Sequence, residues 1–181
     1  LNVIAAQAAI SLENARLMAD ETERQKLEKE MEMARNLQMS ILPRELEDEA
    51  YEIAASMTPA EQVGGDYYDY YRLNGHRWLA IGDVSGHGLN SGLMMLMAQT
   101  SFNTYLKGVP DPGVTELFLT LNRALFENME RTEQDLFMTF TALKADNDGN
   151  FEHAGRHESL LVWRQDTQKV ETIASEGVCI V

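Results

Sequence analysis

The dipeptide Asn74-Gly75 constrains this chain strongly, because it predicts a tight hairpin between two strands. Residues 67–73 before it are aromatic and strand-like, and residues 78–84 after it form the returning strand. The far ends of both predicted strands carry a carboxylate, at Asp66 and Asp83. The hairpin therefore brings these two side chains near each other at one end of an antiparallel sheet.

The segments around this hairpin predict an α+β fold, with helices laid against antiparallel sheet. Residues 1–41 contain no Pro or Gly and are expected to form one long helix, which Pro43 ends. A strand is expected at residues 51–57, and a helix from Leu89 to Lys107. Asp111-Pro112 is expected to start the next helix. The strand-like runs that follow are residues 136–145, 151–154, 159–164 and 169–174.

Apolar spacing predicts which face of each later helix is buried. For the first of them we expect Leu89, Leu93, Leu96 and Met97, with the methionines of this helix filling the core. For the second we expect Val114, Leu117, Phe118, Leu121, Leu125 and Met129.

Composition excludes some classes of function. The formal net charge is −14, from 15 basic and 29 acidic residues, and no basic run is present, so we expect no nucleic-acid partner. The one cysteine, Cys179, excludes an intrachain disulfide and fits the cytoplasm. No signal peptide is visible. Residues 84–106 carry no charge but contain several amides and hydroxyls, so we expect a buried helix and no membrane span.

The long N-terminal helix has an apolar seam at alternating steps of three and four residues, which is typical of a two-stranded coiled coil. Asp20 and Arg24 interrupt the seam. We expect a homodimer through residues 1–41; the alternative is a single helix that packs on its own domain. The apolar members of the seam are Val3, Ala6, Ile10, Leu17, Leu27, Met31, Ala34 and Ile41.

Asp66 and Asp83 are the candidate metal ligands, because clustered carboxylates repel each other and a cation relieves that repulsion. Oxygen ligands select hard ions such as Mg²⁺ or Mn²⁺. Either aspartate alone would be read as a strand start or a helix cap, but both are flanked by glycine. His153 and His157 are four residues apart in strand-like surroundings, so we expect ordinary structural histidines.

These residues resemble the bacterial PP2C-like (PPM) serine/threonine phosphatases of the SpoIIE and RsbU type. The resemblance runs from about Met31 to the end of the chain, and residues 1–17 resemble the closing helix of a GAF sensor domain. We therefore divide the chain into a sensor helix (1–18), a helical signalling linker (19–43) and a phosphatase domain (44–181). The matching runs are residues 34–38 with Leu42-Pro43, Pro59-Ala60 with residues 63–69, residues 82–88, and Phe137-Met138-Thr139.

The resemblance implies an α-β-β-α sandwich with two Mg²⁺ or Mn²⁺ ions, and hydrolysis of phosphoserine or phosphothreonine by water activated between them. Asp66 would ligate one ion, Asp83 would bridge both, and the backbone carbonyl of Val84 would complete the first site. These two aspartates are thus the expected catalytic residues. Asp69 would be an outer-shell acid at most, since a regular strand points it to the other face. His87 is left without a role.

The chain departs from the family in two places. The family's later aspartate motifs, which hold the other metal, do not occur before Val181, so we expect an incomplete domain and an inactive fragment. Arg156 also separates Ala154-Gly155 from His157, where the family reads Ala-Gly-His.

We expect the parent protein to dephosphorylate an anti-sigma-factor antagonist with a STAS domain. The alternative is a non-catalytic dimeric signalling module built on the same fold. A nuclease or pyrophosphatase is disfavoured, since no Lys or Arg stands near the aspartate motifs.

Overall fold

The computed structural model describes residues 2–44, 46–59, 62–175 and 177–181. Leu1 of the expected helix and Ala60 of the quoted motif lie outside these residues. The structure confirms the α+β class and the predicted order of elements except for the strand at residues 51–57. The elements are α1 (Asn2–Ile41), β1 (Tyr67–Leu73), β2 (His76–Val84), α2 (Leu89–Gly108), α3 (Val114–Thr132), β3 (Met138–Ala145), β4 (Phe151–Arg156), β5 (Leu160–Arg164) and β6 (Lys169–Ile173).

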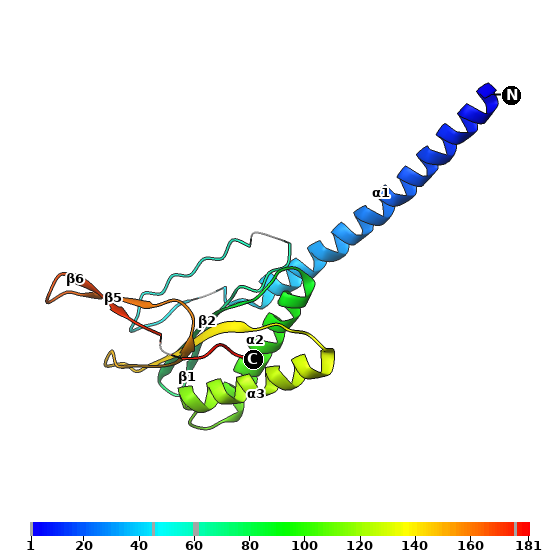
Figure 1. Cartoon of the computed structure of the whole chain (residues 1–181). Helices are drawn as coiled ribbons and strands as arrows, with labels where there is room; N and C mark the ends of the chain where they lie inside the picture. The colour runs from blue at the N-terminus through cyan, green and yellow to red at the C-terminus, as the bar shows by residue number, and fades with distance from the viewer. Residues whose placement is uncertain (1, 45, 60–61, 176) are drawn as a thin grey trace.

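The first four strands form one antiparallel sheet in the order β1-β2-β3-β4, and β5 pairs with β6 in a separate hairpin. Helices α2 and α3 pack on one face of the sheet, while α1 projects from the body as a long rod (Figure 1). The predicted turn is confirmed, with positive φ at Asn74 (52°) and Gly75 (79°). Tyr67, Trp78 and Phe140 point into the layer between sheet and helices and are at most 1% exposed.

The predicted face of α3 is confirmed, because its six expected residues are the buried ones. The predicted face of α2 is wrong, since Leu89 and Leu93 are 46% and 47% exposed. Apolar residues surround α2 on most sides, so spacing alone did not single out its buried face. The small residues Ser91 and Gly92 turn inward instead and let α2 approach the chain at Val63. Helix α3 also begins at Val114, later than Asp111-Pro112 predicted.

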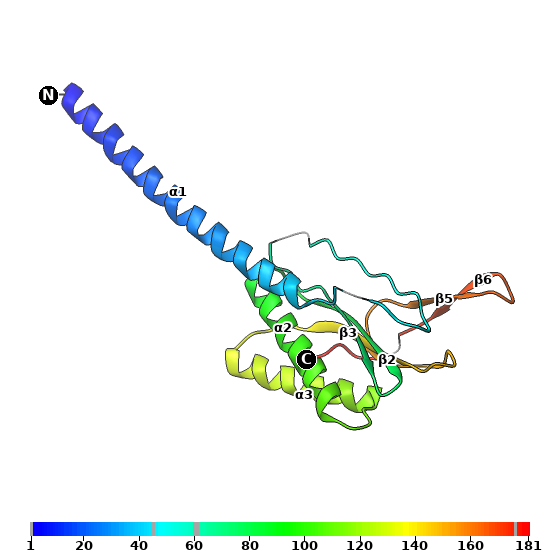
Figure 2. The same ribbon diagram turned by 180° about the vertical axis from the view of Figure 1, so that it is seen from behind.

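Residues 46–59, which we call the strap, replace the strand expected at 51–57. The strap runs along the sheet on the side away from α2 and α3 (Figure 2). Side chains anchor it: the Tyr51 hydroxyl donates to the Asp146 carbonyl at 2.6 Å, and Tyr70 donates to Asp48 at 2.8 Å. A segment that is held on a sheet face by its side chains does not add a strand to the sheet edge.

A buried ion pair is the strongest of these anchors. The Arg77 Nε donates to the Asp48 carboxylate at 2.8 Å, and the two side chains are 5% and 0% exposed. The guanidinium also lies over the Tyr51 ring and donates to Asn147 in the β3–β4 turn. The hydrogen bond from Arg77 holds the pKa of Asp48 well below its ordinary value. Strap and sheet are therefore joined by a charge pair that requires an ionised Asp48.

We predict that acid weakens the fold partly through this pair. A carboxyl whose folded-state pKa is lowered stabilises the protein above its unfolded pKa of about 4, and that stabilisation is lost as the pH falls toward the folded value. Asp48→Asn should lower the melting temperature at neutral pH and flatten its decline in acid, as thermal melts from pH 7 downward would show.

The matched control for this prediction is Glu49→Gln, because the Glu49 side chain is 85% exposed and lies 3.8 Å from Arg72. That change should leave the pH dependence as in the wild type. If the melting temperatures of both variants decline with acid as the wild type's does, Asp48 does not make this contribution.

Candidate functional site

One row of side chains crosses all four strands of the main sheet at the end where β2 leads into α2. Continuing the β1–β2 register by one position places Asp66 opposite Asp83. Asp83 pairs in turn with Thr139 on β3, and continuing the β3–β4 register places Thr139 opposite His157. We call these four residues the Asp66 row. The predicted approach of the two aspartates therefore follows from the register of the hairpin.

The electrostatics agree with this placement. Both carboxylates of the pair are exposed at the sheet end. Partial burial and, next, repulsion by Asp66 raise the pKa of Asp83, whereas the charge of His157 opposes the rise. A carboxyl whose pKa is raised by a neighbouring carboxylate is a place that a cation would stabilise.

Gly65 lets the backbone of β2 come close beside this pair. The Val84 amide donates to the Gly65 carbonyl at 3.3 Å. A Cβ atom at Gly65 would lie 2.6 Å from the Val84 carbonyl oxygen and 2.9 Å from the Val84 Cβ. Glycine is therefore required here, and the Val84 carbonyl, which the resemblance names as a ligand, directly follows Asp83 in the sequence and lies beside Gly65, the residue before Asp66.

Asp69 lies on the opposite face of the sheet from Asp66. It is 5% exposed and accepts a hydrogen bond of 2.9 Å from the Tyr67 hydroxyl, on the side that packs against α2. Burial raises its pKa, and the hydrogen bonds it accepts oppose that rise. We therefore leave Asp69 out of the proposed metal site.

Sequence reasoning missed two members of the row, Thr139 and His157. The Thr139 hydroxyl lies 2.8 Å from His157 Nδ1 and donates to the Asp83 carbonyl at 3.2 Å. The expectation that His157 is an ordinary structural histidine stays a prediction; the structure places its ring against the Thr139 hydroxyl, one strand away from Asp83. The signal in the sequence is the predicted pairing of β3 with β4, because the residue-by-residue register of that pair places His157 opposite Thr139.

The chemistry of these residues fits a hard divalent cation, since carboxylate and carbonyl oxygens converge at one sheet end. The fit is partial: among the described residues, no group of three or more His, Cys, Asp or Glu side chains could hold a metal ion. Asp66 and Asp83 thus supply part of a ligand set.

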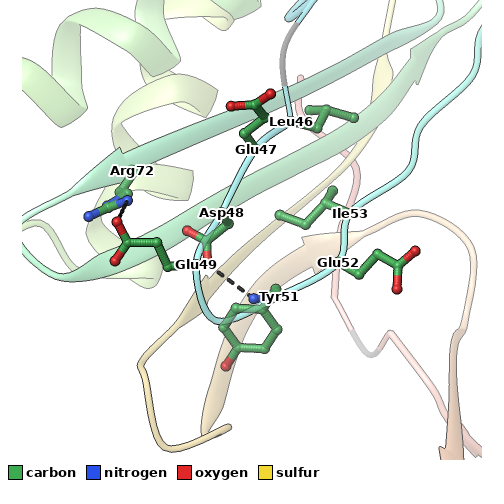
Figure 3. A pocket seen from close by; sticks show the side chains of 8 residues that line it. All are labelled: Leu46, Glu47, Asp48, Glu49, Tyr51, Glu52, Ile53 and Arg72. Carbon is green, nitrogen blue, oxygen red and sulfur yellow. Dashed lines mark hydrogen bonds and ion pairs between the residues drawn. The ribbon is translucent and has the colours of Figure 1, made fainter.

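Two cavities lie along the strap. One, of about 370 Å³, lies between residues 54–58 and the sheet, and Asp66 and His157 line it. The other, of about 560 Å³, is bordered by residues 46–49, 51–53 and Arg72 (Figure 3). Two of the acidic side chains that line it, Asp48 and Glu49, make the contacts with Arg77 and Arg72 described above.

None of the helices in the described part of the chain has the length and hydropathy needed to cross a bilayer.

Comparisons with known proteins agree with this geometry. The model of the family "Stage II sporulation protein E (SpoIIE)" matches residues 74–180, which include Asp83, Val84, Thr139 and His157 but not Asp66. The SiaA-PP2C domain of Pseudomonas aeruginosa has a similar structure, with a TM-score of 0.70 and 20% identity over 87% of this chain and 63% of that one. At this identity the likeness shows the fold alone.

Two proteins of Bacillus subtilis (strain 168) are similar in sequence. Phosphoserine phosphatase RsbU is 30% identical over 109 residues, 59% of this chain and 31% of RsbU. Phosphoserine phosphatase RsbP is 28% identical over 104 residues, 56% of this chain and 26% of RsbP. The match to this chain thus spans about a third or less of the length of these relatives.

We predict that the pKa of Asp83 reports the charges of the row. Asp66→Asn should lower it by removing the repulsion. His157→Gln should raise it, because the charge interaction with His157 lowers the pKa of Asp83. Carbon-detected NMR titration of the Asp83 carboxyl measures both changes. Asp148→Asn in the β3–β4 turn is the control and should leave the pKa of Asp83 unchanged. Equal shifts of this pKa in all three variants would refute the placement of the Asp66 row.

Proposed function

Because the chain belongs to the SpoIIE family of PP2C-type phosphatases, we propose that it forms part of a metal-dependent protein serine/threonine phosphatase in bacterial signalling. The observation that carries the proposal is the placement of Asp66 opposite Asp83 at the open end of the sheet. The names of RsbU and RsbP, both phosphoserine phosphatases, support the reaction class.

We assign the first ligands to Asp66, Asp83 and the Val84 carbonyl. Mg²⁺ or Mn²⁺ bound there would supply Lewis-acid activation of water and of the phosphoryl group. The chain's own contribution is to hold two ionised carboxylates on adjacent strands and to fix the His157 ring beside them through the Thr139 hydroxyl. The remaining ligands would come from residues outside this set.

The proposed substrate is a phosphorylated STAS-domain protein that antagonises an anti-sigma factor. Its support is the similarity to RsbU and the likeness, at a TM-score of 0.51 and 20% identity, to a structure titled for the RsbU and RsbW domains of Rv1364c from Mycobacterium tuberculosis. We place the reaction in the cytoplasm and propose the domain division given above, with residues 19–43 as the signalling linker.

We also propose a homodimer through α1. Large apolar side chains stand exposed along it, among them Ile10 (56%), Leu17 (56%) and Leu27 (53%), and a partner helix would bury them. The proposed interface leaves out the end of α1, because Gln38 is buried and Ile41 packs on the chain's own domain.

The catalytic prediction concerns the full-length protein with Mn²⁺ and a phosphorylated substrate. Asp83→Asn should reduce kcat by more than about a hundredfold, because loss of even an outer-shell partner of a metal reduces activity ~10–100-fold. Asp166→Asn, in the exposed β5–β6 turn, should keep full activity. Unchanged phosphate release by Asp83→Asn would refute the mechanism. Phosphate release that is absent in the wild type, with substrate binding retained, would favour the non-catalytic signalling module.

A second prediction concerns residues 1–181 alone. Two carboxylates and one carbonyl leave a hard ion with most of its waters, so Mn²⁺ should bind more weakly than micromolar, and phosphatase activity should be absent. Titration calorimetry measures the affinity, and Asp66→Asn should weaken it further. Sub-micromolar binding would contradict the partial ligand set.

A further inference from the structure

Helix α2 and the loop before β3 together expose three large apolar side chains at the end of the sheet that carries the Asp66 row. Leu89, Leu93 and Phe137 are 46%, 47% and 49% exposed, and we call these three residues the apolar rim. Leu89 and Leu93 are four residues apart and therefore lie on one side of the first turns of α2. Single exposed apolar residues are common, but a group of them beside a candidate active site marks a surface for binding.

Phe137 lies directly beyond the Asp66 row on β3. The Ser85 amide donates to the Phe137 carbonyl at 2.7 Å, which continues the β2–β3 ladder by one pair past Val84 and Met138. Residues two apart along a strand share a face and are separated by about 7 Å, so strand alternation places Phe137 on the face of Thr139. The Phe137 amide also donates to the Ser85 hydroxyl, at 3.0 Å. Both backbone groups of Phe137 are thus bonded, and its position next to the row is fixed.

The two segments that carry the apolar rim are joined to each other. The Asn90 amide, in the first turn of α2, donates to the Gln134 side-chain oxygen at 3.0 Å. Behind the loop, Leu136 packs against the core, and its Cδ2 would lie 3.9 Å from a Cβ atom at Gly86. The rim is therefore a supported surface that follows Asp83 along the chain and borders the same sheet end.

The segments around the rim carry no positive charge of their own. Residues 78–106 and 132–143 contain no Lys or Arg, whereas Asp83, Glu133 and Asp135 are acidic. A phosphoserine brings further negative charge, so these segments do not attract it, and under the proposed function a metal ion would bind its phosphate. Binding of the rest of the substrate on this side then has to come from uncharged contacts, which the apolar rim offers.

We infer that the apolar rim binds an apolar side chain of the phosphoprotein substrate, close in sequence to the phosphoserine, and thereby helps to select the substrate. The inference rests on the proposed phosphatase function. Phe137 is two strand positions from Thr139, so the bound side chain is about one to three residues from the phosphoserine in an extended peptide. A leucine at that position would lose apolar surface to the rim and gain about tenfold in kcat/KM over a polar residue.

Synthetic phosphoserine peptides test the inference with the full-length protein and Mn²⁺. Each peptide has Asn on both sides of the phosphoserine except at one position, within three residues of it, where Leu or Lys stands instead. Leu at one of these positions should raise kcat/KM about tenfold over the all-Asn peptide.

The outcomes of this experiment separate the inference from the proposed function. A preference for Lys, or equal rates for all peptides while p-nitrophenyl phosphate is hydrolysed, would overturn the inference and leave the phosphatase reaction standing. Absence of hydrolysis for the peptides and for p-nitrophenyl phosphate alike would overturn the proposed function, and this inference with it.

Matched variants test whether the rim causes the preference. Phe137→Ser should remove the preference for the Leu peptide, and Leu93→Ser should lower it several-fold. Phe126→Ser is the control, because Phe126 is also 49% exposed but lies on α3, and it should keep the wild-type preference. The preference is a ratio measured within each variant, so a loss of folded protein does not alter it.

A wild-type preference in both the Phe137 and the Leu93 variants would overturn the inference. If these two variants then also had a lower melting temperature or a smaller oligomeric state than Phe126→Ser, the rim would be assigned to another part of the protein or to a second copy.

Discussion

The antiparallel register between β1 and β2 is the constraint on which the rest of this structure depends. The Asn74-Gly75 turn fixes it, and a slip by one residue would move Asp66 and Asp83 to opposite faces. The same register sends Tyr67 into the layer covered by α2 and α3 and leaves Asp66 on the face beside the strap. Core and candidate site are therefore two faces of one hairpin.

The main electrostatic feature of this sheet end is the repulsion between the carboxylates of Asp66 and Asp83. An antiparallel hairpin has no need to place like charges opposite each other, and doing so is destabilising unless something neutralises them. Family membership and the raised pKa of Asp83 both support the cation site proposed above. The loop that leads into Asp66 is also held from α1, where the Gln38 amide donates to the Gly64 carbonyl at 2.6 Å.

Features that depend on residues close together in the sequence could be predicted, and contacts between distant residues could not. The hairpin, the face of α3 and the approach of the aspartates follow from spacing and turn chemistry. The position of Asp69 on the other face also follows, from strand alternation. The strap did not, because Asp48 and Tyr51 are anchored to Arg77 and Asp146, which are distant in sequence. His157 was missed for the same reason, since only the register of β3 with β4 brings it into the row.

The most direct test of the account is where a paramagnetic Mn²⁺ ion binds in solution. Amide signals of nitrogen-labelled protein can be followed as Mn²⁺ is added, because broadening falls off steeply with distance from the ion. We expect the strongest broadening at residues 65–67 and 83–85, fading along the hairpin toward Asn74, and its loss in Asp66→Asn with Asp83→Asn. Broadening centred on the acidic strap or on α1, and unaffected by those changes, would contradict the assignment of the site.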